Sequence, residues 1–122
     1  MEEGSQTIEI AIFEAESGEV RVQIQEESVW LTQRQMAEVF DTSTDNISLH
    51  LKNIFADGEM AEEATTEDLS VVRREGQREV RRRLRHYGLD VILAVGYRVS
   101  SGRAIQFRKW ATRILRDHLV QG

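Results

Sequence analysis

The chain has 122 residues, which suits a single domain large enough to bury a core of its own. The absence of cysteine excludes disulfides and thiolate metal sites and fits the reducing cytoplasm, where we expect the protein to reside. Because no apolar run approaches about 18 residues and no basic-then-apolar leader is present, the sequence predicts neither a membrane span nor a signal peptide.

The formal net charge of −5 conceals an asymmetry along the chain. Residues 1–69 hold 17 acidic side chains against 3 basic ones, a net charge of −14, whereas residues 70–122 hold 4 against 13, a net charge of +9. A domain polarised in this way presents an acidic side and a basic side. The basic side predicts an anionic partner.

The N-terminal quarter of the chain predicts a small β-sheet. Residues 1–7 form a polar start that we expect to be disordered. Apolar residues then alternate with polar or small ones over residues 8–12 and again over residues 20–25, which is the period of a strand. The linking residues 16–19, Glu-Ser-Gly-Glu, are a hairpin turn signal. We therefore interpret residues 8–31 as a β-hairpin scaffold.

Residues 32–57 predict two short helices joined by a tight turn, the helix-turn-helix arrangement that places a helix in the major groove of DNA. Thr32 suits the N-cap of the first helix, and Ser43 or Thr44 suits that of the second. Asp41 stands at the turn, where such proteins usually have glycine. Aspartate is among the few other residues that tolerate a positive φ, so the departure is mild.

The second of these helices has an inner and an outer side. Four apolar residues recur at helical spacing and predict one buried stripe: Ile47, Leu51, Ile54 and Phe55. The candidate base-reading residues near its N-terminus and on its outer side are Thr44, Asp45, Asn46, Leu49, Lys52 and Asn53. Asparagine pairs with adenine, lysine with guanine or phosphate, and leucine contacts a thymine methyl. Since this set holds a single cation, we expect the remaining positive charge to come from elsewhere.

The next informative stretch is residues 70–87, SVVRREGQREVRRRLRHY. The sequence Glu75-Gly76-Gln77 is a turn signal, and apolar and basic residues alternate from residue 80 to residue 86. This pattern predicts a basic β-hairpin, which after a helix-turn-helix is the layout of a winged helix. The acid-rich residues 57–68 that precede it are interpreted as a solvated loop or a weak helical turn.

As a strand, the hairpin places Arg81, Arg83 and Arg85 on one face. Residues on one face of a strand lie about 6.6 to 7 Å apart, close to the spacing of successive phosphates, so we expect each arginine to contact one phosphate. Two alternatives stay open. The arginines are also suited to guard an edge strand against aggregation, and residues 78–86 also fit a helix with glutamate–arginine pairs.

Residues 90–120 predict two helices separated by Ser100-Ser101-Gly102. Asp90 suits the N-cap of the first helix. Gly96 inside that helix requires another element to pack closely over it. The second helix, from about Arg103, carries an apolar stripe of Phe107, Trp110, Ala111, Ile114, Leu115 and Leu119. Because Gly122 directly follows this helix, we expect the chain to be the N-terminal part of a longer protein.

The sequence offers no chemistry for catalysis. His50, His86 and His118 lie on separate predicted elements without a metal-ligand spacing. There is no phosphate-cradling glycine loop and no cysteine nucleophile, and the carboxylates lie in runs typical of solvated surface. We therefore expect no enzyme, no catalytic residues, no metal, no cofactor and no evident small-molecule substrate.

The predicted fold class is α+β: one domain over residues 1–122, with a winged-helix-like helix-turn-helix, small antiparallel β-hairpins and a C-terminal helical pair. The predicted function is sequence-dependent binding of double-stranded DNA, with the second helix reading bases and the basic hairpin gripping phosphates. The alternative is a protein-interaction or homodimerisation domain that uses Leu49 and the C-terminal amphipathic helix. The acidic N-terminal half favours the alternative, and the net charge of +9 in the C-terminal half favours DNA.

The stretch YGLDVILAVGYRVSSGRAIQFRKWATRILRDHL, residues 87–119, closely resembles the signature of the RhuM family of bacterial proteins. The upstream residues 31–55, LTQRQMAEVFDTSTDNISLHLKNIF, are similar to the N-terminal region of the same family, so the resemblance runs from about Val29 to the C-terminus. It implies a DNA-binding protein associated with virulence and often encoded beside type I restriction-modification genes, with no catalytic residues to carry over. The C-terminal helix is more weakly similar to the Bro-N domains of phage and viral antirepressors.

Overall fold

The computed structural model describes residues 9–121, without the side chains of Arg73 and residues 119–121. The predicted disordered start and the first residue of the predicted hairpin scaffold lie outside this part of the chain. The side chain of Leu119, the last of the predicted C-terminal stripe, lies outside it as well.

Strands and helices alternate in groups along the described residues. In chain order they are β1 (Glu9–Ala15), β2 (Gly18–Gln25), β3 (Ser28–Thr32), α1 (Gln33–Phe40), α2 (Thr44–Ala56), α3 (Glu62–Thr65), β4 (Thr66–Glu75), β5 (Arg78–Gly88), α4 (Leu89–Val99) and α5 (Ser101–Gln121). The predicted α+β class is confirmed, with five helices and one antiparallel sheet in residues 9–121. In that range, no helix is long and apolar enough to cross a membrane.

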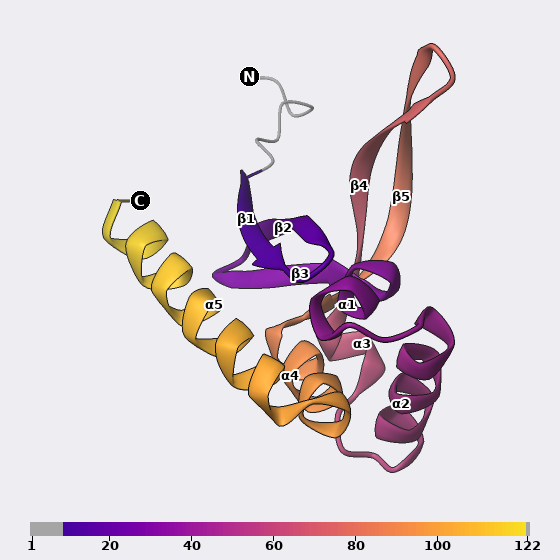
Figure 1. Cartoon of the computed structure of the whole chain (residues 1–122), viewed down its shortest axis with the longest axis vertical. Coiled ribbons are helices and arrows are strands. Elements are labelled where there is room, and N and C mark those ends of the chain that lie inside the picture. Colours follow the sequence, from indigo (N-terminus) through magenta and orange to yellow (C-terminus); the bar gives the residue numbers. More distant parts are fainter. Residues whose placement is uncertain (1–8, 122) are drawn as a thin grey trace.

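The sheet has the strand order β1-β2-β3-β5-β4, and neighbouring strands run antiparallel. β3 pairs with β5 through Trp30–Thr32 against His86–Gly88. β4 and β5 pair with each other over a much longer ladder that ends at the Glu75–Arg78 pair. Residues 66–85 therefore form a two-stranded ribbon, here called the arm, which projects from the sheet (Figure 1).

The basic hairpin predicted over residues 70–87 is present, and the helical alternative for residues 78–86 is wrong. The hairpin is longer than predicted because β4 begins at Thr66, inside the acid-rich segment that the sequence assigns to residues 57–68. Acidic residues are accommodated in this strand because basic residues face them across the ladder, as an arginine of β5 faces Asp68.

The N-cap predicted at Asp90 is wrong. α4 begins directly after Gly88, whose extended backbone (φ −78°, ψ 174°) occupies the cap position without a side-chain hydrogen bond. Asp90 lies in the first turn instead, where the helix dipole favours a carboxylate. The break between the C-terminal helices is also shorter than predicted, because Ser100 alone separates them and α5 begins at Ser101.

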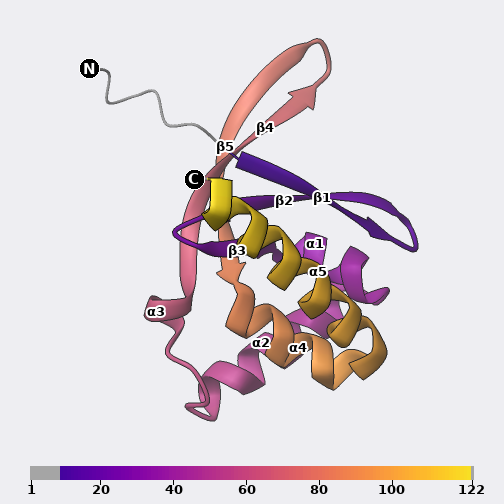
Figure 2. The same ribbon diagram turned by 90° about the vertical axis from the view of Figure 1, so that its left-hand side faces the viewer.

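The core lies between one face of the sheet and helices α1, α2, α4 and α5. Phe107 of α5 is its centre: its ring meets those of Phe13 and Phe40 edge to face, with centroids 5.1 and 6.4 Å away. Figures 1 and 2 show α5 lying along this face of β1 to β3. The predicted stripe of α5 is thus used inside the domain, since Phe107 and Ala111 are buried and Trp110 packs on Phe13 at 5.3 Å.

Gly96 marks a close approach between three helices. A Cβ atom at this position would lie 2.5 Å from Cζ of Phe40 in α1 and 3.1 Å from Cβ of Ala104 in α5. The close packing that the sequence requires over this glycine is therefore confirmed. The glycine therefore lets α4 pack closely against α1.

Candidate nucleic-acid interface

The α1–α2 unit is fixed by hydrogen bonds at both helix N-termini. Thr32 Oγ1 accepts the N–H of Gln35 at 3.1 Å, and Gln35 Oε1 accepts the N–H of Thr32 at 3.0 Å, which together form a capping box. Ser43 Oγ accepts the N–H of Asn46 at 3.1 Å, so Ser43, rather than the next residue, caps α2. Asp41 has a φ of 55°, in the left-handed region. The predicted cap at Thr32 and the predicted positive φ at Asp41 are both confirmed.

A second link between the two helices comes from Gln33 at the start of α1. Its Nε2 donates to Ser48 Oγ at 2.6 Å and to the carbonyl oxygen of Thr44 at 3.1 Å. These bonds join the first turn of α1 to the first two turns of α2 and fix the angle between them. The sequence does not predict this role for Gln33, because nothing in its local pattern indicates which residue of α2 it meets.

The inner side of α2 is buried as predicted. Ile47, Leu51 and Ile54 belong to the core, and Phe55 is half-buried. The ring of Phe55 stacks on that of Tyr87, with centroids 6.4 Å apart and planes 22° apart. This contact joins the last turns of α2 to the base of the arm.

Most of the predicted base-reading residues face solvent. Leu49 has 54% of its surface exposed, and four others are also exposed: Thr44, Asp45, Lys52 and Asn53. Asn46 differs from them, because it is half-buried and its Nδ2 donates to Thr42 Oγ1 at 3.0 Å. One of its two side-chain donors is therefore engaged within the turn.

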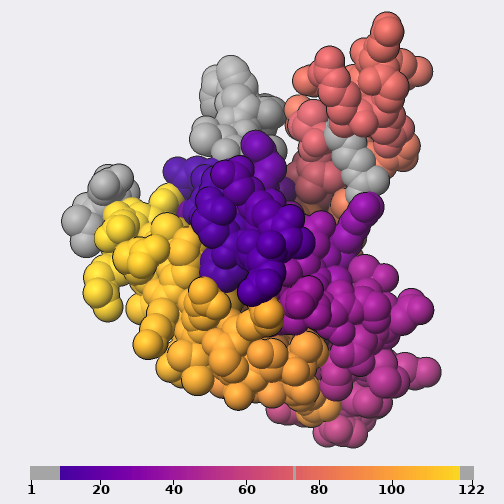
Figure 3. Space-filling view, in the orientation of Figure 1, coloured from indigo at the N-terminus to yellow at the C-terminus, as the bar shows by residue number. Residues whose placement is uncertain are grey.

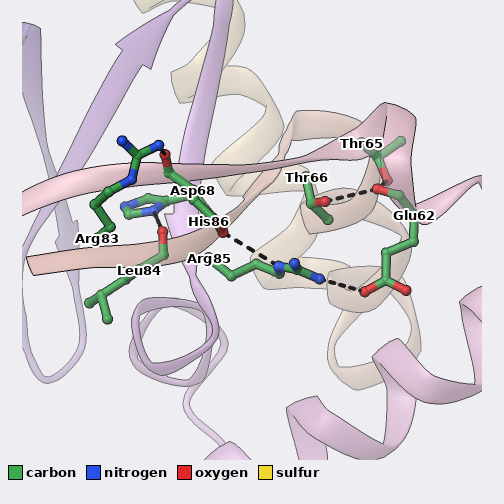
Figure 4. A network of polar contacts seen from close by, with 8 residues as sticks. All are labelled: Glu62, Thr65, Thr66, Asp68, Arg83, Leu84, Arg85 and His86. Carbon is green, nitrogen blue, oxygen red and sulfur yellow. Dashed lines mark hydrogen bonds and ion pairs between the residues drawn. The ribbon is translucent and has the colours of Figure 1, made fainter.

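The three arginines predicted to contact phosphates are all exposed, but they differ in their partners. Arg85 Nη1 lies 2.9 Å from Glu62 Oε2, and Arg85 Nε lies 3.6 Å from Asp68 Oδ1 (Figure 4). Arg83 Nη2 donates to the backbone carbonyl of Asp68 at 2.9 Å. Arg81 has no ion pair with any side chain that the structure describes. Of the three arginines, Arg81 is therefore the most available to bind an anion, and Arg85 is the least available.

The structure separates the two predicted contact sets instead of bringing them together. Figures 1 and 2 show α1 between α2 and the arm, with the tip of the arm far from α2. Two further cations, Arg21 on β2 and Arg34 on α1, line a cleft beside the arm. Both are exposed. The strand alternation around Arg21 and the position of Arg34 opposite the apolar side of α1 would have identified them as surface residues.

His86 lies at the base of the arm and is 1% exposed. Its Nδ1 is 2.8 Å from the carbonyl oxygen of Leu84. Burial lowers the pKa of this imidazole, against smaller opposing effects of that carbonyl and of Asp68. Within residues 9–121, no group of three or more histidine, aspartate or glutamate side chains is placed to hold a metal ion.

Comparison with protein families gives a match for the C-terminal half of the chain. Residues 64–122 match the model of the Virulence protein RhuM family, a range that spans the whole arm and both C-terminal helices. The resemblance stated for that region is thereby confirmed. Its upstream part, from Val29 to residue 63, and the similarity to Bro-N domains are not covered by this match. No curated protein and no solved structure matches the chain.

Proposed function

We propose that this chain, whose residues 64–122 match the model of the Virulence protein RhuM family, binds double-stranded DNA in a sequence-dependent manner. In this proposal α1 and α2 act as a helix-turn-helix, α2 lies in the major groove, and the arm acts as a wing that grips phosphates. The chain has no catalytic role in the proposal.

One observation carries the proposal: the outer side of α2 is exposed on a helix that is otherwise rigidly held. The cap at Ser43, the Gln33 side chain and the buried stripe fix α2 against α1. A base-reading helix needs this combination, because side chains discriminate bases only when their backbone is held in register with the groove. Asn53 and Lys52 supply polar contacts, and Leu49 supplies an apolar contact to a thymine methyl.

The arm supports the proposal through its charge and its reach. Arg81 and Arg83 lie on one face of β5, two residues apart, so their spacing along the strand matches that of successive phosphates. We assign Arg85 a smaller share, because it reaches a phosphate only by releasing Glu62 and Asp68. Affinity then comes mainly from the arm, and discrimination between sequences comes mainly from α2.

The second candidate function is a protein-interaction or homodimerisation domain. Its support is the exposure of large apolar side chains outside the core: Leu49 at 54%, Tyr97 at 41% and Ile105 at 38%. The stripe of α5 gives it less support, because Phe107 and Ala111 are buried within the same chain. Light scattering distinguishes this candidate: a monomer at high protein concentration argues against the homodimer and leaves DNA binding unaffected.

The direct test of the proposed function is fluorescence anisotropy with random-sequence duplexes at low and at moderate salt. We expect saturable binding that weakens as salt increases, because phosphate contacts release counterions. Selection from a random duplex pool then yields a preferred site that binds more tightly at the same salt. If no binding occurs even at low salt, the proposal is wrong and the interaction domain becomes the better account.

A further inference from the structure

A cleft of about 940 Å³ separates the arm from the rest of the domain. Its walls are the outer face of β1 and β2, the first turns of α1, and the side of the arm that faces them. Figure 3 shows the arm standing apart beside the β1–β2 hairpin. This volume is in the range typical of small-molecule sites. The cleft is distinct from the outer side of α2, and it shares Arg85 of the arm with the predicted phosphate contacts.

Apolar side chains line two opposite walls of the cleft. Ile10 of β1, which is 39% exposed, lines one wall. Val71 and Leu84, both half-buried, line the other from the arm. Apolar walls that face each other across an open gap favour a hydrocarbon group, because its insertion removes apolar surface from water on both sides.

Gln23 of β2 also lines the cleft and is 5% exposed. Its Nε2 donates to the carbonyl oxygen of Ser70 in the arm at 2.9 Å. Its Oε1 is buried and has no hydrogen-bond partner among the described residues. A buried acceptor without a donor is costly, so a ligand N–H or O–H that reaches this oxygen gains a hydrogen bond that the protein alone does not make.

Access to this oxygen requires the arm to move slightly away from β2. The arm is joined to the rest of the sheet ladder only at its base, where β3 pairs with His86–Gly88. The Gln23–Ser70 hydrogen bond adds a polar link between the arm and β2. A ligand that enters the cleft therefore displaces a ribbon held at one end, and the core remains unchanged.

Three arginines line the cleft: Arg21, Arg34 and Arg85. Arg85 is already paired with Glu62 and Asp68, which leaves the other two for a ligand. Arg21 lies on the same face of β2 as Gln23, and Arg34 lies in the first turn of α1. The first turn of α1 is joined to β2 beside them, because Gln35 Nε2 donates to the carbonyl oxygen of Arg21 at 2.7 Å. Guanidinium groups bind carboxylates in a planar, bidentate geometry. Glu19 and Glu38 line the same cleft, so a singly charged anion fits better than a multiply charged one.

We propose that this cleft binds a small amphipathic carboxylic acid that carries an N–H donor, of the N-acyl amino acid class. The acyl chain lies between Ile10 and the apolar residues of the arm. The amide N–H donates to Gln23 Oε1, and the carboxylate binds Arg21 and Arg34. Because β-strand residues two apart are about 6.6 to 7 Å apart, the long side chain of Arg21 reaches a carboxylate beside an amide bound at Gln23.

The test compares two probes that differ in one hydrogen-bond donor: N-octanoylglycine, and N-octanoylsarcosine, in which a methyl group replaces the amide hydrogen. Calorimetric and NMR titrations of the whole chain are expected to show saturable one-to-one binding of N-octanoylglycine, with shifts confined to β1, β2, α1 and the arm. We expect N-octanoylsarcosine to bind about fivefold more weakly, the effect of one neutral hydrogen bond.

Two variants separate the donor contact from steric and charge effects. Gln23→Met keeps the length of the side chain and removes the amide oxygen, so it should bind both probes equally. A preference that persists in this variant means that the extra methyl group, and not the hydrogen bond, is the cause, and overturns the assignment of Gln23. Replacing Arg21 and Arg34 by Gln should weaken both probes about tenfold and leave the uncharged N-octanoylglycinamide unaffected.

The matched control replaces two exposed arginines of α5, Arg113 and Arg116, by Gln, which removes the same charge away from the cleft. Binding of N-octanoylglycine should be unchanged in this control. The proposal is overturned if N-octanoylglycine does not bind saturably to the natural chain, if its shifts lie outside the cleft, or if the control weakens it equally. Because the titrations contain no DNA, these outcomes are independent of the proposed function.

Discussion

α2 and the arm carry the two sets of predicted DNA contacts, and they are held in opposite ways. α2 is anchored along its length by Ile47, Leu51 and Ile54, and its outer side is left with few internal contacts. The arm is anchored at its base, and three of its arginines, Arg82, Arg83 and Arg85, bond to groups of the same chain. α2 is thus a firmly held helix whose outer side chains are mostly exposed. The arm projects from the domain, and several of its arginines are already bonded to groups of the same chain.

The difference shows that position and availability are separate properties of a contact residue. The alternation of β5 sets Arg81, Arg83 and Arg85 on one face, but Glu62 and Asp68 decide which of them is free to meet an anion. On α2 the same distinction separates Asn53, which is exposed, from Asn46, which is half-buried and bonded to Thr42. Rigid placement favours discrimination, whereas a projecting basic ribbon favours non-specific affinity.

The largest expected effect is on the stability of the helix packing that holds α1 and α2 in place. Gly96→Ala places a methyl group 2.5 Å from Phe40 Cζ, so we expect the free energy of unfolding to fall by about 1–3 kcal/mol as α1 is pushed away from α4. Gly102→Ala is the matched control, because its Cβ meets nothing within 4 Å; helix propensity predicts a gain of about 1 kcal/mol there. Urea unfolding of both variants checks this, and equal stability would contradict the tight helix packing.

The next effect distinguishes the two asparagines of α2. Asn53→Ala should reduce discrimination between the preferred duplex and a scrambled one by about 1–3 kcal/mol, the value of one good base contact, with no change in salt dependence. Asn46→Ala should have a smaller effect on discrimination, since one of its donors bonds to Thr42. Anisotropy titrations at one salt concentration measure both. Unchanged discrimination in Asn53→Ala means that the outer side of α2 does not read bases.

A smaller effect tests whether internal ion pairs limit the arm. Glu62→Gln removes the carboxylate 2.9 Å from Arg85, so DNA binding should tighten about threefold and log affinity should fall more steeply with log salt, by up to about 0.9. Glu63→Gln is the control: it makes the same charge change at the neighbouring exposed residue of α3. If both variants change the slope equally, the cause is overall charge and Arg85 is not being released.

The smallest effect is a pH dependence of stability at the base of the arm. Because burial lowers the pKa of His86 from its ordinary value of 6.5, the unfolded chain binds more protons than the folded chain in mildly acidic solution. Stability is therefore lost as pH falls from about 6.5 towards the lowered pKa. Urea unfolding above and below this window should show a smaller loss in His86→Gln than in the natural chain. An equal loss in both proteins would assign the dependence to other groups.

The predictable part of this molecule is the part determined by local physics. Thr32 and Ser43 act within three residues of the groups that they cap, and the stripe of α2 is a periodicity within one element. The strand alternation of β5 is local in the same sense. Asp90 shows the limit of this reasoning. The N-cap of α4 is Gly88, the residue at which β5 is still paired with β3, and the local sequence around Asp90 does not indicate this pairing.

The features that the sequence does not predict are of two kinds. Some depend on contacts between residues that are distant in sequence, and others depend on backbone conformations that the residue type does not favour. The Gln23–Ser70 bond spans 47 residues and the Arg85–Glu62 pair spans 23, so neither has a local signature. The β2–β3 turn places Glu26 and Glu27 at φ values of 53° and 61°, where asparagine and glycine are the usual turn residues. The tertiary pairing of β3 with both β2 and β5 outweighs that local cost.

The central claim is that the arm grips phosphates while α2 reads bases, and the salt dependence of DNA binding tests it most directly. Replacing Arg81 and Arg83 by Ala should reduce the slope of log affinity against log salt by about 1.8 and weaken random and preferred duplexes alike, since each lost phosphate contact contributes about 0.9. Replacing Arg113 and Arg116 by Ala removes the same charge from α5, a helix that Figure 1 shows apart from the arm, and should leave the slope unchanged. An unchanged slope in the folded arm variant, or an equal change in both, would contradict the account.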